Sequence, residues 1–245
     1  MIPVDTSKRS DAPETMDDFS MEGEILRDAL DKIASINRLL GGNYVTLNGV
    51  KKILSAIDKR NTQKTISILD VGCGNGDMLR TLADYGAAKG LNFQLTGIDA
   101  NGFTVGHAEQ LSAAYSNISY LCEDIFQEIK QDCKYDVILC TLTLHHFKDN
   151  EILKLMQGFE SQAKMGIVVN DLHRSRIAYY LFKVICFIFR LNKMSRDDGL
   201  VSILRGFKKS DLTTYSKLLD FKNYTLRWKW AFRYQWIIIT RQNNI

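Results

Sequence analysis

The sequence predicts an α/β fold: a doubly wound, seven-stranded and mostly parallel sheet with a C-terminal antiparallel hairpin and an N-terminal helical extension. Segments rich in β-branched residues alternate with segments whose apolar residues recur at helical spacing, which is typical of a parallel sheet covered by helices. A short link joins the last two β-rich runs, as in a hairpin. With 245 residues, 45% of them hydrophobic, the chain can form one such domain and its extension.

The extension is expected over residues 1–60 and the main domain over residues 61–245. Residues 1–20 are polar and contain both prolines, so we expect them to be partly disordered. A helix is expected over 22–40, because its apolar residues recur at helical intervals before a Gly-Gly stop. A second helix is expected around Val50, where apolar residues stand at i, i+3, i+4 and i+7.

Strand and helix patterns then alternate through the main domain. Strands are expected at 66–70, 93–98, 118–121, 135–140, 165–170, 224–230 and 234–240. Helices are expected near 77–88, 102–115, 149–161, 173–190 and 210–219.

A glycine-rich turn follows the first of these strands. The strand ends in Asp70, and Gly72, Gly74 and Gly76 then alternate with other residues before a helix pattern starts at Asp77. Glycines allow positive φ and a close approach of backbone to ligand, so this turn predicts a nucleotide-type binding loop. A dinucleotide fingerprint would need its third glycine at position 77. The acids at 70 and 77 disfavour phosphates and suit a positively charged ligand.

The pattern Asp70-x-Gly72-x-Gly74-x-Gly76 resembles motif I of the class I S-adenosylmethionine-dependent methyltransferases. The resemblance covers roughly residues 64–170 and implies a Rossmann-like methyltransferase fold. It implies S-adenosyl-L-methionine as the cofactor, which carries a sulfonium and an ammonium and no phosphate. By the same resemblance, Cys73 of the loop belongs to the cofactor site.

The extension commonly covers the substrate mouth in this family. The resemblance therefore implies that Met16, Asp17 and Phe19 belong to a lid. The alternative is a packing helix with a frayed N-terminal tail.

Residues after the second and third strands complete the expected cofactor site, since ligands of doubly wound sheets lie at the carboxyl ends of strands. Asp99, followed by Ala100, is expected to accept both ribose hydroxyls, with capping of the next helix as the alternative. The family places an acid for the adenine amine after strand three. That position maps to Asp124, with the N–H of Ile125 on the ring, and Glu123 is the alternative acid.

The fourth strand ends in Cys140 and Thr141, and the run Leu144-His145-His146-Phe147 follows. This resembles motif IV of small-molecule methyltransferases, where the strand ends beside the methionine moiety. The Asn/Asp-Pro-Pro-aromatic element of enzymes that methylate base amino groups is missing. No metal is expected, because Asn170-Asp171 has no companion acid near Cys140 and the histidines lack metal-ligand spacing.

Three histidines are candidates for a general base. His173 follows the fifth strand and is the first choice, and His145 and His146 are further candidates. Asp171 is expected either to orient one of them or to cap the next helix. The mechanism implied is in-line methyl transfer to a nucleophilic atom of the substrate, most simply oxygen, in which positioning supplies most of the rate enhancement.

The segment 177–190 is apolar on nearly every side. We interpret it first as a core helix, and alternatively as an interfacial helix at a membrane surface or as the wall of an apolar pocket. A pocket wall of this kind would suit a small aromatic or isoprenoid acceptor. Asn37-Arg38 and the run 202–207 are similar to bacterial enzymes of phenol, quinone, polyketide and isoprenoid pathways. That similarity implies that Arg205 faces the acceptor, the alternative being an exposed, solubilising arginine.

Charge and cysteine content set the remaining expectations. Residues 171–245 hold 15 Lys/Arg against 5 Asp/Glu, so an RNA methyltransferase is an alternative, although the nearby aromatics alternate with cations as in a half-buried hairpin. A non-catalytic S-adenosylmethionine-binding protein is a second alternative.

Five cysteines without C-x-x-C spacing are expected to be reduced core residues of a cytoplasmic protein. No signal peptide or membrane-spanning run is found.

Overall fold

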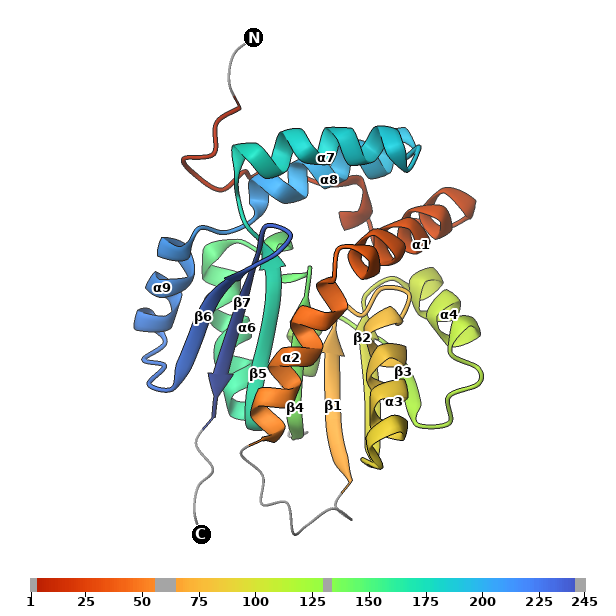
Figure 1. Cartoon of the computed structure of the whole chain (residues 1–245), viewed down its shortest axis with the longest axis vertical. Helices are drawn as coiled ribbons and strands as arrows, with labels where there is room; N and C mark the ends of the chain where they lie inside the picture. Colours follow the sequence, from red (N-terminus) through yellow and green to blue (C-terminus); the bar gives the residue numbers. More distant parts are fainter. Residues whose placement is uncertain (1–3, 56–64, 130–133, 241–245) are drawn as a thin grey trace.

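The computed structural model describes residues 4–55, 65–129 and 134–240. Figure 1 shows one central sheet with helices on both faces and further helices beyond one end of the strands. The strands are β1 (Ile66–Val71), β2 (Phe93–Asp99), β3 (Ile118–Cys122), β4 (Tyr135–Thr141), β5 (Ala163–Leu172), β6 (Tyr224–Lys229) and β7 (Arg233–Ile239). The helices are η1 (Thr15–Asp17), α1 (Glu24–Leu39), α2 (Gly42–Leu54), α3 (Asp77–Lys89), α4 (Gly102–Leu111), α5 (Ile125–Glu128), η2 (Leu144–His146), α6 (Asp149–Gln162), α7 (Arg176–Ile188), α8 (Lys193–Arg205) and α9 (Lys209–Leu218).

The strands form one sheet in the order β3-β2-β1-β4-β5-β7-β6. Strands β1 to β5 pair in parallel, and β7 is antiparallel to both of its neighbours. This confirms the expected doubly wound sheet with its C-terminal hairpin. The strand order reverses between β1 and β4, and ligands of such sheets bind outside the carboxyl ends of the strands at that reversal.

An apolar layer covers each face of the sheet. On one face α2 and α3 contribute Val50 and Leu79, both fully buried. On the other face α6 contributes Phe159, which belongs to the same cluster as Trp236 of β7. Burial of each such side chain contributes about 1.5–3 kcal/mol, so the two layers fix the sheet that carries the loops.

Helix α2 packs directly on the sheet. A Cβ added to Gly49 would come within 2.5 Å of Val168 on β5, so only glycine allows this approach. Asn170 Nδ2 donates to the carbonyl oxygen of Gly42 and to Thr46 Oγ1, each at 3.0 Å. The helix begins at Gly42, earlier than its apolar spacing predicts. Its buried start therefore sits next to the carboxyl end of β5.

The apolar segment 177–190 forms α7, but its interpretation as a core helix is wrong. Only Ala178 and Cys186 of this helix are buried, and Phe187 is 86% exposed. The physical reason is its position: α7 lies beyond the carboxyl ends of the strands, next to α8, and no described helix or strand covers its outer side (Figure 1). One side of α7 therefore faces the inside of the molecule and the other faces solvent.

Helix α8 is not predicted by the sequence pattern. The first half of the helix is polar, so its few apolar residues do not show a helical spacing. Asn192 caps it by accepting a hydrogen bond from Ser195 N at 2.9 Å. Gly199 lets α7 come close, since a Cβ there would be 2.4 Å from the Phe182 ring. The short helices η1, η2 and α5 are also unpredicted, and the expected helix 102–115 ends at Leu111.

The expected disorder of residues 1–20 is wrong for residues 4–20, which lie along α8 and the loop after β4. We call residues 4–21 the N-terminal segment. The Arg9 guanidinium donates to the carbonyl oxygens of His145, Phe147 and Arg205 at 2.8–3.0 Å. These bonds hold the segment against the end of the sheet that carries the glycine loop.

Some sequence expectations concern single positions. Cys73, Cys140 and Cys186 are buried free thiols, but Cys122 is exposed, because its strand β3 lies at the edge of the sheet. Cys133 and the domain boundary expected near residue 60 lie outside the described residues. Within the described ranges, no helix combines the length and the apolar character that a bilayer-spanning segment needs.

Candidate functional site

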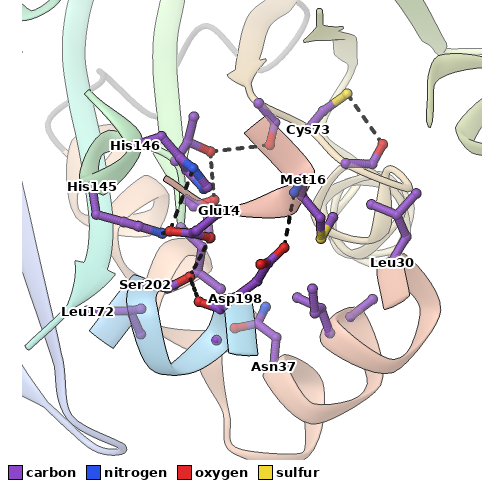
Figure 2. A pocket seen from close by; sticks show the side chains of 18 of the residues that line it. Glu14, Met16, Leu30, Asn37, Cys73, His145, His146, Leu172, Asp198 and Ser202 are labelled. Atoms are coloured by element: carbon purple, nitrogen blue, oxygen red, sulfur yellow. Dashed lines mark hydrogen bonds and ion pairs between the residues drawn. The ribbon is translucent and has the colours of Figure 1, made fainter. Parts of the chain in front are cut away.

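A cavity of about 860 Å³ opens at the carboxyl ends of β1, β2, β4 and β5, where the strand order reverses. Helices α1, α7 and α8 and the N-terminal segment cover it, and Figure 2 shows residues of α1, α8 and the N-terminal segment around it. Most of the site residues expected from the sequence line this cavity. They are Asp70, Gly72, Cys73, Gly74, Asp99, Ala100, Asp124, Ile125, Thr141, His145, His146 and His173.

Gly76 and Cys140 do not line the cavity. Gly76 precedes α3 with φ of 77°, and a Cβ there would be 2.0 Å from the hydroxyl of Tyr120. Cys140 is buried in the core cluster under β4. Gly76 therefore allows the turn of the loop to pack against Tyr120, on the side away from the cavity. Cys140 packs in the core and supports the end of β4. Their expected roles in cofactor binding stay predictions.

The glycine loop leaves its cavity side open. Gly72 and Gly74 have φ of 65° and 52°, which side chains rarely adopt. A Cβ on Gly72 would be 2.4 Å from Thr143, whereas a Cβ on Gly74 would meet only Leu30, at 4.0 Å. The backbone at Gly74 is therefore accessible to a ligand. Its N–H donates to Asp99 Oδ2 at 3.1 Å, which joins the loop to the end of β2.

Two acids beside the loop, Asp70 and Asp99, have raised pKa values because burial disfavours their charged forms. Asp70 is buried, its Oδ1 has no hydrogen-bond partner, and burial together with the charge of Asp99 raises its pKa to about 8. Burial also raises the pKa of Asp99, against hydrogen bonds from the N–H groups of Asn101 and Gly74. Two carboxyl groups in this state favour a ligand with positive charge.

Asp77, the third acid expected to face the ligand, is already engaged. It forms an ion pair with Arg38, and its Oδ2 accepts a hydrogen bond from Asn43 at 2.6 Å. Among the described residues, the acids without a cationic partner beside the loop are therefore Asp70 and Asp99, and Asp77 ties α1 and α2 to the start of α3.

The third strand ends as the sequence predicts, with Asp124 and Ile125 at the cavity. Asp124 caps α5 by accepting from Phe126 N at 2.9 Å, so one of its oxygens is engaged. Glu123 also lines the cavity. The choice between the two acids for an adenine amine stays a prediction.

Two histidine–aspartate pairs stand side by side after β4. His145 Nδ1 lies 2.7 Å from Asp171 Oδ1, and His146 Nδ1 lies 2.7 Å from Asp17 Oδ1. Burial acts to raise the pKa of Asp171, but the charge and hydrogen bond of His145 outweigh it and hold that pKa below its ordinary value. Hydrogen bonds from His146 and Arg205 likewise outweigh burial and lower the pKa of Asp17. Asp171 thus orients a histidine, as expected, and Ser175 caps α7 instead.

The two pairs differ in access. The side chain of His145 is 3% exposed and that of His146 is 28% exposed. The Nε2 atom of His145 is buried without a hydrogen-bond partner, 3.9 Å from Glu14 Oε1. Figure 2 shows Glu14 beside both histidines, and its Oε2 accepts a hydrogen bond from Ser202 of α8 at 2.7 Å. The N-terminal segment therefore covers Nε2 of His145, and His146 is the more accessible of the two histidines at the cavity.

Glu14, His145 and His146 come close enough to hold a metal ion, with one ligand atom of each within 4.8 Å of the others. The sequence pattern could not suggest this group, because Glu14 is far away in the chain. Arg205 already pairs with the acid of this group and with Asp17, since its Nη1 lies 3.5 Å from Glu14 Oε1 and 2.6 Å from Asp17 Oδ2. Arg205 is buried, so its interpretation as an exposed arginine is wrong.

His173 has a different environment. Its Nδ1 accepts a hydrogen bond from the indole N–H of Trp228 at 3.2 Å. Because an indole can only donate, the proton of neutral His173 is on Nε2. Burial and the charges of Arg174 and Lys208 lower the pKa of His173, which favours this neutral form. His173 therefore offers the cavity a donor and no free lone pair.

Three functional candidates were not predicted from the sequence: Glu14, Asp198 and Arg233. Asp198 accepts hydrogen bonds from Thr15 N at 2.9 Å and Met16 N at 3.0 Å, which positions η1 over the cavity. Arg233 begins β7 and lines the cavity with its guanidinium buried. No local motif marks these residues, since each acts across a long sequence separation.

The donor set fits the expected cofactor. An orphaned buried carboxyl oxygen on Asp70 suits a cationic group, and the open side of Gly74 suits a ligand close to the backbone. Asp99 lies at the end of β2, where an acid can accept ribose hydroxyls. The residues that line this part of the cavity are compatible with S-adenosylmethionine.

Comparisons with known proteins agree with this geometry. A family model described as a methyltransferase domain matches residues 68–166. Ubiquinone biosynthesis O-methyltransferase of Coxiella burnetii (strain RSA 493 / Nine Mile phase I) is 27% identical over 170 residues, which cover 67% of each chain. The protein of the same name from Rickettsia canadensis (strain McKiel) is 30% identical over 129 residues and 49% of each chain.

Solved structures show the same fold at low sequence identity. Magnesium protoporphyrin IX methyltransferase from Synechocystis PCC 6803, with bound S-adenosylmethionine, aligns with a TM-score of 0.55 and 15% identity over 92% of this chain and 89% of that one. A plantazolicin methyltransferase in complex with a substrate analogue and S-adenosylhomocysteine aligns with a TM-score of 0.63 and 12% identity, over 87% and 91% of the two chains.

Proposed function

Since the chain belongs to the class I S-adenosylmethionine-dependent methyltransferases that act on small molecules, we propose that it methylates a hydroxyl group of an aromatic or isoprenoid acceptor. The observation that carries this proposal is the histidine–aspartate pair His146–Asp17 at the wall of an apolar cavity. The relatives named as ubiquinone O-methyltransferases support oxygen as the atom that is methylated.

The cofactor belongs at the glycine loop. When bound there, S-adenosylmethionine supplies an electrophilic methyl group on its sulfonium. Gly74 offers an open backbone, Asp99 accepts hydrogen bonds at the end of β2, and Asp70 offers a buried carboxyl oxygen whose ionised form a cation would stabilise. These groups orient the donor, and orientation alone can contribute about 7–11 kcal/mol to a transfer reaction.

His146 is the general base of the proposed reaction. Asp17 holds its Nδ1 proton, so the lone pair is on Nε2. The side chain lines the cavity and is partly exposed, so an acceptor hydroxyl can approach it. The hydroxyl proton passes to Nε2 as the acceptor oxygen becomes nucleophilic. A base of this kind contributes about 10²–10⁴-fold in rate.

His145 and His173 have supporting roles in this proposal. His145 Nε2 lies under Glu14 and is closed to the cavity, so His145 and Asp171 together stiffen the loop that carries His146. His173 donates rather than accepts, because Trp228 occupies its Nδ1. Both histidines are therefore expected to affect positioning more than proton transfer.

The acceptor occupies the part of the cavity below α7 and α8. Leu181, Phe182 and Ile185 of α7 line it, together with Ile203 of α8. Such side chains bind apolar rings or chains and exclude water. The cavity volume of about 860 Å³ is at the upper end of ligand pockets, as expected for a site shared by a cofactor and an acceptor.

The N-terminal segment acts as the lid, since Asp17 comes from it and orients the base. Asp198 and Arg205 of α8 hold the segment through polar contacts, and Met16 and Phe19 face the cavity. Phe19 is 60% exposed, so few apolar contacts hold the segment down. Opening of this segment would admit substrates, and closure would complete the His146–Asp17 pair.

The test is transfer of a labelled methyl group from S-adenosylmethionine to a panel of phenols and prenylated phenols. We expect a labelled O-methyl product with the wild-type protein and at least a hundredfold lower turnover with His146→Ala, at unchanged affinity for S-adenosylhomocysteine. His173→Ala serves as the comparison and is expected to keep most of the activity. Full turnover by His146→Ala would remove His146 as the base, and label in RNA but in no phenol would favour the RNA alternative.

A further inference from the structure

The guanidinium of Arg233 is a buried cation without a partner. Arg233 is 4% exposed, and its Nε and Nη1 atoms are buried with no hydrogen-bond acceptor. No carboxylate of the described residues forms a salt bridge with it. Burial lowers its pKa to about 10, against the charge of Asp171, so it stays positive at neutral pH. A buried guanidinium without hydrogen-bond acceptors destabilises a protein, so its presence at a cavity indicates a site for an acidic ligand.

The other buried arginines of the described chain have partners. Arg174 donates to the carbonyl oxygens of Thr6 and Gly206 and to Asp211. Arg205 pairs with acids and carbonyls of the N-terminal segment and of η2. Arg233 is the exception, and it is also the buried arginine that lines the cavity.

The position of Arg233 separates it from the glycine loop. It opens β7 opposite Leu172 at the end of β5, and β7 stands three strands away from β1 in the sheet. At about 4.8 Å per strand, this places its backbone about 14 Å from the loop across the sheet. Leu172, its register partner on β5, and Trp230 and Phe232, which precede it in the chain, also line the cavity and are apolar. Arg233 therefore belongs to the acceptor end of the cavity.

We propose that Arg233 binds a carboxylate carried by the acceptor, so that the enzyme selects hydroxylated aromatic or isoprenoid acids over their uncharged analogues. A guanidinium can donate two parallel hydrogen bonds to one carboxylate, and the apolar surroundings strengthen such a pair. Leu172, Trp230 and Phe232 can cover the ring or chain that bears the acid. This inference rests on the proposed function, since it concerns the acceptor of that reaction.

Two carboxylates could reach a guanidinium in this cavity: that of the acceptor and that of the methionine moiety of the cofactor. The distance from the glycine loop favours the acceptor. The test therefore measures both affinities in the wild-type protein and in Arg233→Met, which keeps much of the side-chain length without the charge. Arg227→Met, an exposed arginine on the neighbouring strand β6, is the matched control.

The protein is first titrated with S-adenosylhomocysteine. The saturated complex is then titrated with 3,4-dihydroxybenzoate and, separately, with 3,4-dihydroxybenzamide, which has the same shape without the negative charge. We expect the acid to bind about tenfold or more tightly than the amide, and Arg233→Met to abolish this preference without weakening the amide. Arg233→Lys is expected to keep part of it, and Arg227→Met all of it.

A stability measurement separates this role from a structural one. Removal of an unpaired buried cation should leave the melting temperature of Arg233→Met equal to or above that of the wild type. The same change at Arg174, whose partners would be left unpaired, should lower it. A lower melting temperature for Arg233→Met would assign Arg233 a structural role instead.

The binding results distinguish the remaining explanations. Failure of S-adenosylhomocysteine to bind would contradict the proposed function itself. Normal cofactor binding with no preference for the acid, or with a preference that survives Arg233→Met, would overturn the carboxylate site. Loss of S-adenosylhomocysteine affinity in Arg233→Met would also overturn it, by assigning the guanidinium to the cofactor.

Discussion

Asp17 Oδ1 lies 2.7 Å from Nδ1 of His146, although 129 residues separate them in the chain. The contact joins the N-terminal segment to the loop after β4. Because the lone pair of His146 is on Nε2 only while Asp17 holds the other nitrogen, the position of this segment controls whether the proposed base is ready.

Replacement of Asp17 by Asn should separate catalysis from cofactor binding. The amide lacks the negative charge that fixes the histidine tautomer and stabilises its protonated form, so we expect kcat to fall about ten- to a hundredfold. Asp18→Asn is the control, because the Asp18 carboxylate accepts its hydrogen bonds from the neighbouring Ser20 and not from His146. Steady-state kinetics with the labelled cofactor measure the effect, and an unchanged kcat in Asp17→Asn would rule out this role.

Arg205 is expected to hold the N-terminal segment closed. Its guanidinium donates to Asp17 and to the carbonyl oxygens of His145 and His146, a set of bonds that lysine cannot reproduce. We predict about tenfold faster amide hydrogen exchange in residues 10–20 of Arg205→Lys.

Arg196→Lys, on the exposed side of the same helix, serves as its control, since the Arg196 guanidinium pairs with the neighbouring Asp197 and not with the N-terminal segment. Equal protection of residues 10–20 in both variants and in the wild type would show that Arg205 does not fasten the segment.

Asp70 should make the stability of the cofactor-free protein depend on pH. Its pKa rises from 3.8 to about 8 on folding, so the folded state holds a proton that the unfolded state has lost. The contribution of this carboxyl to the free energy of unfolding is fully present below pH 3.8 and is lost as the pH rises through about 8. Asp70→Asn should flatten the fall in melting temperature between about pH 4 and pH 8.

Asp84→Asn, an exposed position on α3, is the matched control for this experiment and should leave the pH profile as it is. If Asp70→Asn kept the wild-type slope, another group would have to be responsible for it.

The local patterns of the sequence predicted the frame of the site well. All seven strands are found, each end within two residues of its expected position, because β-branched runs bounded by turn residues are local signals. The glycine loop and Asp99 could be placed for the same reason. Each lies directly at the end of a strand, and the topology then brings the strand ends together.

The site features that the sequence did not predict depend on contacts between segments that are distant in the chain. Glu14 and Asp17 reach the two histidines only because residues of α8, itself unpredicted, hold the N-terminal segment. The tautomer of His173 depends on Trp228, which a separate strand brings alongside. The composition of α7 likewise could not reveal whether another layer covers its outer side.

The exposure of α7 leads to a paired prediction about stability. Phe187 is 86% exposed, so Phe187→Ser should change the free energy of unfolding by no more than about 0.5 kcal/mol. Phe159 is fully buried in α6, so Phe159→Ala should cost about 3–5 kcal/mol. Urea unfolding of both variants measures the contrast. A loss of several kcal/mol in Phe187→Ser would mean that α7 is a core helix after all.

The glycine loop flanked by acids is expected to hold a positively charged methyl donor. Titration calorimetry of the purified protein with S-adenosylhomocysteine tests it most directly. We predict saturable binding at one site per chain, weakened at least about tenfold by Asp99→Asn through loss of charged hydrogen bonds. Absence of binding to S-adenosylhomocysteine, together with uptake of a nicotinamide dinucleotide, would contradict the account.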